Sequence, residues 1–85
     1  MARYFFDIHN GDEFFRDPEG IECSDAGSIR TEAMRTLPEI ARHTILARKA
    51  DVQALTILVR NQDQRTVYAA TLTFSGLWVD EPLGS

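Results

Sequence analysis

The sequence predicts a two-layer α+β domain with the element order β-β-α-β-β. Three observations support this: strand-forming residues and a hairpin turn near the start, one long amphipathic helical segment, and two apolar strands after it. One amphipathic helix can cover one face of a sheet. If the connection through the helix is a right-handed crossover, the first strand lies between the second and the third. The four-stranded, largely antiparallel sheet then has the order 2-1-3-4.

The first two strands are predicted from residue types and from a turn. Residues 4–8 are mainly aromatic or β-branched, which suits a pleated and half-buried surface. Asn10-Gly11 is a strong hairpin signal, because a type I′ turn requires positive φ at both central residues. With this pair at the turn, His9 lies opposite Asp12 and Ile8 lies opposite Glu13.

This register divides the hairpin into two faces, because residues paired across two strands point to the same side of a sheet. One face carries Tyr4, Phe6, Ile8 and Phe15, and the other carries Phe5, Asp7, His9, Asp12, Phe14 and Arg16. Both faces of the hairpin therefore carry aromatic side chains. After the hairpin, residues 17–20 fit a type I turn, or a bulge in a strand that resumes at residues 21–23.

The middle of the chain has helical periodicity. Ser24 or Asp25 is placed to cap the helix, and the end is expected between Ala47 and Lys49. Pro38 removes one backbone hydrogen bond, so we expect a kink or a break there. The apolar stripe consists of Ile29, Ala33, Leu37, Ile40, Ala41 and Ile45, with Met34 at its edge.

Two strands are predicted after the helix, at residues 55–59 and 67–74. Their inward-facing residues pair Leu55 with Leu72, Ile57 with Ala70, and Val59 with Tyr68. The connecting turn has Gln64 where we would expect a glycine. Residues 1–76 form a single domain in this interpretation, and residues 77–85 form a C-terminal tail.

Composition limits the function classes. The chain has 85 residues, 26% of them charged, and no apolar run near the ~20 residues that a membrane helix needs. Its start enters a strand directly, so we expect no signal peptide. The single Cys23 cannot form an internal disulfide, and free cysteines are usually buried. We therefore expect a cytoplasmic protein with no membrane contact.

The opening motif M-x-R-Y-F-F-D-I-H-x-G, the pair Asp17 and Gly20, and the helical segment 30–42 carry a resemblance. They resemble a family of short bacterial proteins, mostly alphaproteobacterial, that is known only as a domain of unknown function. The resemblance covers roughly residues 1–74, and the chain departs from it at Gln64 and after Phe74. It implies a fold and supplies no catalytic residues.

Candidate chemistry is sparse. Asp7, His9 and Asp12 share a face beside the hairpin turn and are weak candidates for a metal site. Neighbouring strand residues on an open face diverge, however, and no second cluster completes a ligand shell. No phosphate-binding loop, nucleophile elbow or zinc spacing is present in the sequence. We therefore expect no enzyme activity and no cofactor.

The strongest functional signal is an apolar surface on the sheet face opposite the helix, which no second helix covers. Residues 77–79 could fold back over this surface, or a second copy or another protein could pack against it, and both could occur together. Packing of a partner would make the chain a self-associating or protein-interaction domain. Its expected members are Phe5, Phe14, Arg16, Leu58, Val67 and Trp78.

The alternative is a nucleic-acid-binding module, or one that binds a small ligand or a metal. Aromatic residues on a four-stranded sheet, flanked by arginine, are typical of surfaces that stack RNA bases. The net charge of −4 and the carboxylates of Asp7 and Asp12 on the same face disfavour contact with phosphates. We therefore expect a protein partner, with a homodimer as the simplest case.

Overall fold

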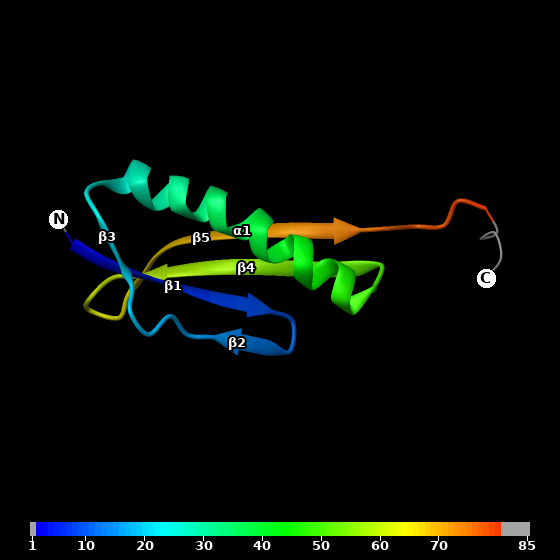
Figure 1. The fold of residues 1–85 in the computed structure, drawn as a ribbon, viewed down its shortest axis with the longest axis horizontal. Coiled ribbons are helices and arrows are strands. Elements are labelled where there is room, and N and C mark those ends of the chain that lie inside the picture. The colour runs from blue at the N-terminus through cyan, green and yellow to red at the C-terminus, as the bar shows by residue number, and fades with distance from the viewer. Residues whose placement is uncertain (1, 81–85) are drawn as a thin grey trace.

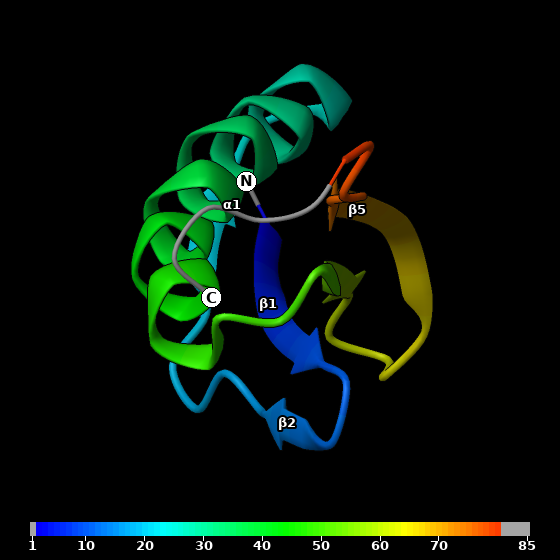
Figure 2. The ribbon, with the colours of Figure 1, turned by 90° about the vertical axis from the view of Figure 1, so that its right-hand side faces the viewer.

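The computed structural model describes residues 2–80. It contains one helix packed on an antiparallel sheet, so the predicted α+β class is confirmed (Figures 1 and 2). The elements are β1 (Ala2–Asn10), β2 (Glu13–Phe15), β3 (Ile21–Cys23), α1 (Ala26–Arg48), β4 (Val52–Arg60) and β5 (Thr66–Ser75).

The sheet has five strands instead of the predicted four. Its order is β2-β1-β4-β5, and β3 pairs separately with β1. The expected second strand is split, because β2 pairs with the end of β1 and β3 pairs with its start. Between these two strands, a side chain pairs with the backbone of β1 where a strand would otherwise do so. Oδ2 of Asp17 accepts a hydrogen bond from the backbone N–H of Phe6 at 3.1 Å.

The predicted hairpin register is wrong by two residues. Ile8 pairs with Phe15 and His9 with Phe14, and the two-residue turn is Gly11-Asp12. Gly11 has a φ of 67° and Asp12 does not have a positive φ, which is the pattern of a type II′ turn. The observed register puts two apolar side chains, Ile8 and Phe15, side by side. A shift of two residues preserves the alternation of side chains, so the predicted division into two faces still holds within β1 and β2, whereas Asp12 lies in the turn and Arg16 lies after β2.

The helix α1 is capped as the sequence indicates. The Asp25 carboxylate accepts a hydrogen bond from the N–H of Ser28 at 2.8 Å, and Lys49 ends the helix in the left-handed region with a φ of 54°. The helix continues through Pro38, so the expected break is absent. The buried stripe of Ile29, Ala33, Leu37 and Ala41 lies on both sides of the proline, and this packing outweighs one lost hydrogen bond.

The core lies between α1 and the inner face of the sheet, which is the face that α1 covers. It consists of Phe6, Cys23, Ile29, Ala33, Leu37, Ala41, Leu55, Ile57 and Val59. The predicted pairs Leu55–Leu72, Ile57–Ala70 and Val59–Tyr68 are confirmed. Gln64 has a φ of 68°, a conformation that favours glycine, as expected for this turn. Within residues 2–80, no helix combines the length and the apolar character needed to cross a membrane.

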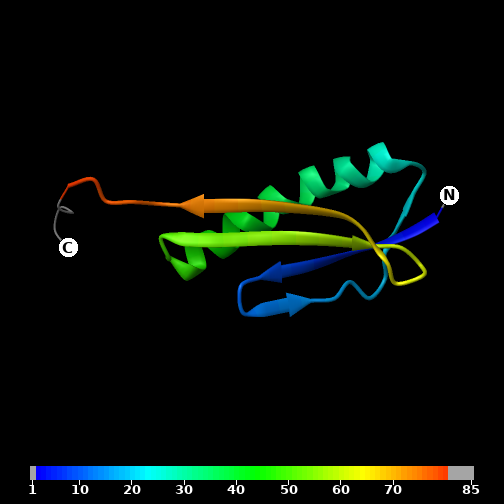
Figure 3. The same ribbon diagram turned by 180° about the vertical axis from the view of Figure 1, so that it is seen from behind.

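The described part of the tail, residues 76–80, runs away from the sheet instead of folding back over it (Figures 1 and 3). Leu77 is 87% exposed, Trp78 67% and Val79 93%. The fold-back alternative is therefore wrong for these residues, and residues 81–85 lie outside the described part of the chain. Three large apolar side chains are thus exposed to solvent just after the end of β5.

Candidate functional site

The face of the sheet opposite α1, here called the outer face, carries a buried ion pair. Asp7 is 4% exposed and Arg60 is 8% exposed. The Nε of Arg60 donates to Oδ2 of Asp7 at 2.8 Å. The two residues lie on the neighbouring strands β1 and β4, 53 positions apart in the sequence. From the sequence, Asp7 was only a weak metal candidate, and Arg60 had no predicted role.

The connection between β2 and β3 and the turn between β4 and β5 complete this polar cluster. Nη2 of Arg60 donates to the carbonyl oxygen of Asp17 at 3.0 Å, and Nη1 donates to Oε1 of Gln64 at 3.1 Å. The N–H of Asp17 donates to Oδ1 of Asp7 at 2.8 Å. The Arg60 guanidinium also lies 4.4 Å from the centre of the Phe5 ring, within cation–π range. One end of the outer face is therefore closed by polar groups that bind one another.

Asp17 fixes the connection that covers this cluster. Burial tends to raise the pKa of its carboxyl group, but hydrogen bonds from the N–H groups of Phe6, Gly20 and Glu19, together with the Arg60 charge, lower the pKa below its ordinary value. A carboxyl group whose pKa is lowered by folding stabilises the protein above its unfolded pKa of ~3.9, and this contribution is lost as the pH falls through the folded value.

We therefore expect Asp17→Asn to lower the free energy of unfolding at neutral pH and to have little effect at low pH, where Asp17 itself is protonated. Urea denaturation of both proteins as the pH is lowered tests this expectation, and Asp63→Asn in the β4–β5 turn is the control. A constant difference between wild type and Asp17→Asn across the whole pH range would contradict the assignment.

The predicted interaction residues come from several different elements of the fold. Phe5 is half-buried between the Arg60 guanidinium and Gly20, and Nη2 of Arg16 donates to Oε1 of Gln64 at 2.5 Å. Phe14 is 50% exposed on the outer face. Of the other three, Leu58 is half-buried on β4, Val67 is exposed on β5, and Trp78 lies in the tail.

The three weak metal candidates are held apart from one another. Asp7 is bound to Arg60, His9 is exposed beside the Phe14 ring at 6.2 Å between centroids, and Asp12 lies in the turn. Among residues 2–80, no three His, Cys, Asp or Glu side chains come close enough to hold a metal ion. Cys23 is buried, as predicted, and burial raises the pKa of its thiol, as do the charges of Glu32, Asp25 and Glu22.

The strand β5 has a free edge at the end of the sheet. In Figure 3 the sheet is seen from its outer face, and β5 is its outermost strand, with β4 on one side only. The strand has ten residues, and none of them is charged or proline. Its one irregularity lies at its start, opposite Val59 and Arg60. The devices that usually protect sheet edges, such as lysine, proline and a bulge along the strand, are therefore missing from most of its length.

Apolar side chains of β5 are exposed on both faces of the sheet beside this free edge. On the inner face, Leu72 is 39% exposed and Phe74 is 43% exposed, and on the outer face Val67 is 48% exposed. The three exposed tail residues follow directly after β5. The described part of the chain thus presents unpaired backbone groups and exposed apolar side chains along the same strand.

A model of the domain of unknown function DUF6894 matches residues 3–73. The chain belongs to this family. No curated protein and no solved structure matches it. The DUF6894 match runs from β1 into β5, so it includes the whole core and the Asp7–Arg60 pair, and it stops before the exposed tail.

Two features of this DUF6894 domain were missed by sequence reasoning. The Asp7–Arg60 pair joins distant positions, and alternation alone does not show that a charged strand residue will be buried. The absence of charge in residues 66–75 can be seen in the sequence. It indicates an interaction edge only once β5 is known to lie at the end of the sheet.

Proposed function

We propose that this domain is a non-enzymatic protein-interaction module that self-associates, with β5 of one copy pairing antiparallel to β5 of a second copy. The observation that carries the proposal is the free edge of β5, with ten residues and no charge. Strand addition at such an edge gains backbone hydrogen bonds along its whole length.

A second copy fits this edge better than an unrelated strand. In a two-fold dimer, the same strand lies on both sides of the interface, so any charged residue near the axis would face its own charge. β5 has no such charge. Two-fold pairing would also bring both α1 helices to the same side of a continuous sheet, with Leu72 and Phe74 of each copy filling the space between them.

The tail supports the same arrangement. Antiparallel pairing would carry residues 77–79 of one copy past the start of β5 in the other copy. Leu77, Trp78 and Val79, which are exposed in the single chain, would lose contact with water there. The apolar surface predicted on the outer face would contribute through Val67, which lies on β5 itself.

We further propose that the domain acts in the cytoplasm of a bacterium. The single buried cysteine agrees with a reducing compartment. A nucleic-acid partner fits less well, because the net charge is −4 and the guanidinium of Arg60 is already bound to Asp7.

The test is a charge-reversal pair on β5. Ala69 and Thr73 are exposed on the outer face, four residues apart, so antiparallel registers centred near residues 69, 71 or 73 bring substituted positions opposite each other. In the register centred near residue 71, the double variant Ala69→Lys/Thr73→Lys makes two like-charge contacts that cost ~1–2 kcal/mol together, so we expect it to weaken dimerisation about tenfold. The registers centred near 69 or 73 make one such contact, and we expect dimerisation to weaken about threefold there. The same holds for Ala69→Glu/Thr73→Glu. An equimolar mixture of the two variants should restore the dimer.

Sedimentation velocity measures all three samples. The control is Thr31→Lys/His43→Lys, which adds two lysines at exposed positions of α1 and should dimerise like wild type. Lysine variants that remain dimeric, or a mixture that stays monomeric while both parents are folded by circular dichroism, would refute pairing through β5.

A further inference from the structure

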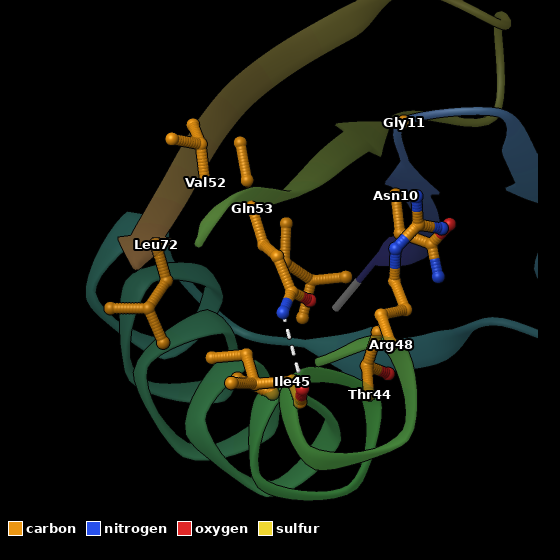
Figure 4. A pocket seen from close by; sticks show the side chains of 11 residues that line it. Asn10, Gly11, Thr44, Ile45, Arg48, Val52, Gln53 and Leu72 are labelled. Atoms are coloured by element: carbon orange, nitrogen blue, oxygen red, sulfur yellow. Dashed lines mark hydrogen bonds between the residues drawn. The ribbon is translucent and has the colours of Figure 1, made fainter. Parts of the chain in front are cut away.

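A small cavity of about 90 Å³ lies where the end of α1 meets the sheet (Figure 4). Its polar lining consists of Asn10 from the end of β1, Thr44 and Arg48 from the last turns of α1, and Gln53 from β4. The apolar walls are formed by Ala41, Ile45, Val52, Ala54, Leu55 and Leu72. The cavity is separate from the Asp7–Arg60 cluster, which lies on the opposite face of the sheet.

Two buried oxygen atoms at this cavity lack hydrogen-bond donors. Asn10 is 8% exposed and Gln53 is 9% exposed, and neither Oδ1 of Asn10 nor Oε1 of Gln53 has a donor within the described residues. Nε2 of Gln53 donates to the carbonyl oxygens of Ile45 and Ala50 at 3.1 and 3.0 Å. These two bonds identify which end of the Gln53 amide is the oxygen, and Figure 4 shows the bond to Ile45. Leaving buried acceptors unpaired is costly, so the site favours a ligand with several donors.

The charge at this site comes from Arg48. Figure 4 shows its guanidinium beside Asn10, and its Nη2 lies 3.8 Å from the position that a Cβ on Gly11 would occupy. No acidic side chain is among the described residues that line the cavity. A bare cation would therefore meet an uncompensated positive charge, whereas a carboxylate would be attracted to it.

We infer that this cavity binds a small zwitterion, namely an α-amino acid of the size of glycine or alanine. Its ammonium group has three donors, which suit the oxygens of Asn10 and Gln53 together with the Thr44 hydroxyl. Its carboxylate accepts hydrogen bonds from Arg48. One water needs ~10–15 Å³ of such a volume, so about 90 Å³ holds several waters and is sufficient for a small amino acid. The inference does not depend on the proposed dimer.

The test is a titration of the ¹⁵N-labelled full chain with glycine, followed by amide chemical shifts. We expect saturable shifts at Asn10, Gln53 and Arg48, and weaker binding of acetate and of methylammonium, because each carries only one of the two charged groups. Arg48→Gln should weaken glycine binding about tenfold or more, whereas methylammonium binding should not weaken, because the substitution removes a positive charge that repels this cation. Arg42→Gln, which removes an exposed charge elsewhere on α1, is the matched control.

Three results would overturn the inference: no saturable shift with glycine, equal binding of acetate and glycine, or glycine binding that is unaffected by Arg48→Gln. The first of these would mean that water alone fills the cavity. Repeating the titration with the Ala69→Lys/Thr73→Lys variant separates the two proposals, since glycine should bind to it as it binds to wild type.

Discussion

Replacing Arg60 with alanine is expected to lower the free energy of unfolding by about 3–5 kcal/mol, the cost of removing one partner from a buried ion pair. Asp7 is 4% exposed in the intact protein, and the substitution would leave its carboxylate with no charged partner in its described surroundings. It would also free the carbonyl oxygen of Asp17 and remove the cation above the Phe5 ring. For a chain of 85 residues, whose total stability is expected to be ~4–13 kcal/mol, this loss would leave a large unfolded fraction.

The double variant Asp7→Leu/Arg60→Met distinguishes two contributions to the loss of stability, namely the loss of the ion pair and the burial of an unpaired charge. Because apolar side chains of similar size can replace a buried ion pair at little cost, we expect the double variant to be more stable than Arg60→Ala. Urea denaturation gives all the values needed. A cost below ~1 kcal/mol for Arg60→Ala would mean that this pair is worth no more than an exposed one.

The second large effect is expected from Gly20→Ala, at about 2–4 kcal/mol, from left-handed backbone strain and overpacking together. Gly20 has a φ of 75°. A Cβ built on it would lie 2.9 Å from Cγ of Arg3 and 2.9 Å from two carbon atoms of the Phe5 ring. The Phe5 ring is held between Gly20 and the Arg60 guanidinium, so it has little room to move.

Gly27→Ala is the matched control for this substitution. Gly27 lies in the first turn of α1, and a Cβ there would come no closer than 3.4 Å, to Oδ1 of Asp25. Alanine is the better helix former, so the control should be neutral or more stable by up to ~1 kcal/mol. Thermal unfolding of both variants measures the difference. Equal stability of Gly20→Ala and wild type would show that the connection between β2 and β3 does not pack on Phe5.

The parts of the fold that depend on local periodicity were predictable. The stripe from Ile29 to Ala41 repeats with the helical period, and the pairs between β4 and β5 follow from simple alternation. The hairpin register was not predictable with the same rules, because Asn10-Gly11 and Gly11-Asp12 are both acceptable turn pairs. The contact between Ile8 and Phe15 on the neighbouring strands favours the observed register, and the turn residues alone do not indicate this contact.

The candidate sites were predictable only in part. The absence of charge in residues 66–75 is visible in the sequence, yet it identifies an interaction edge only when β5 is known to be the last strand. The cavity brings together Asn10, Arg48 and Gln53 from three different elements, and no local pattern relates them. A tail folded back over the sheet was one of two predicted alternatives, whereas in the described residues the tail extends past β5 and exposes Trp78.

Sedimentation equilibrium of the wild-type chain tests the central claim, which is that a second copy completes the sheet at β5. We expect a mass that approaches twice the monomer value of 9.6 kDa as the concentration rises through the micromolar range. A mass of 9.6 kDa at every concentration, with the chain folded, would contradict it and leave the edge of β5 without a second copy to bind.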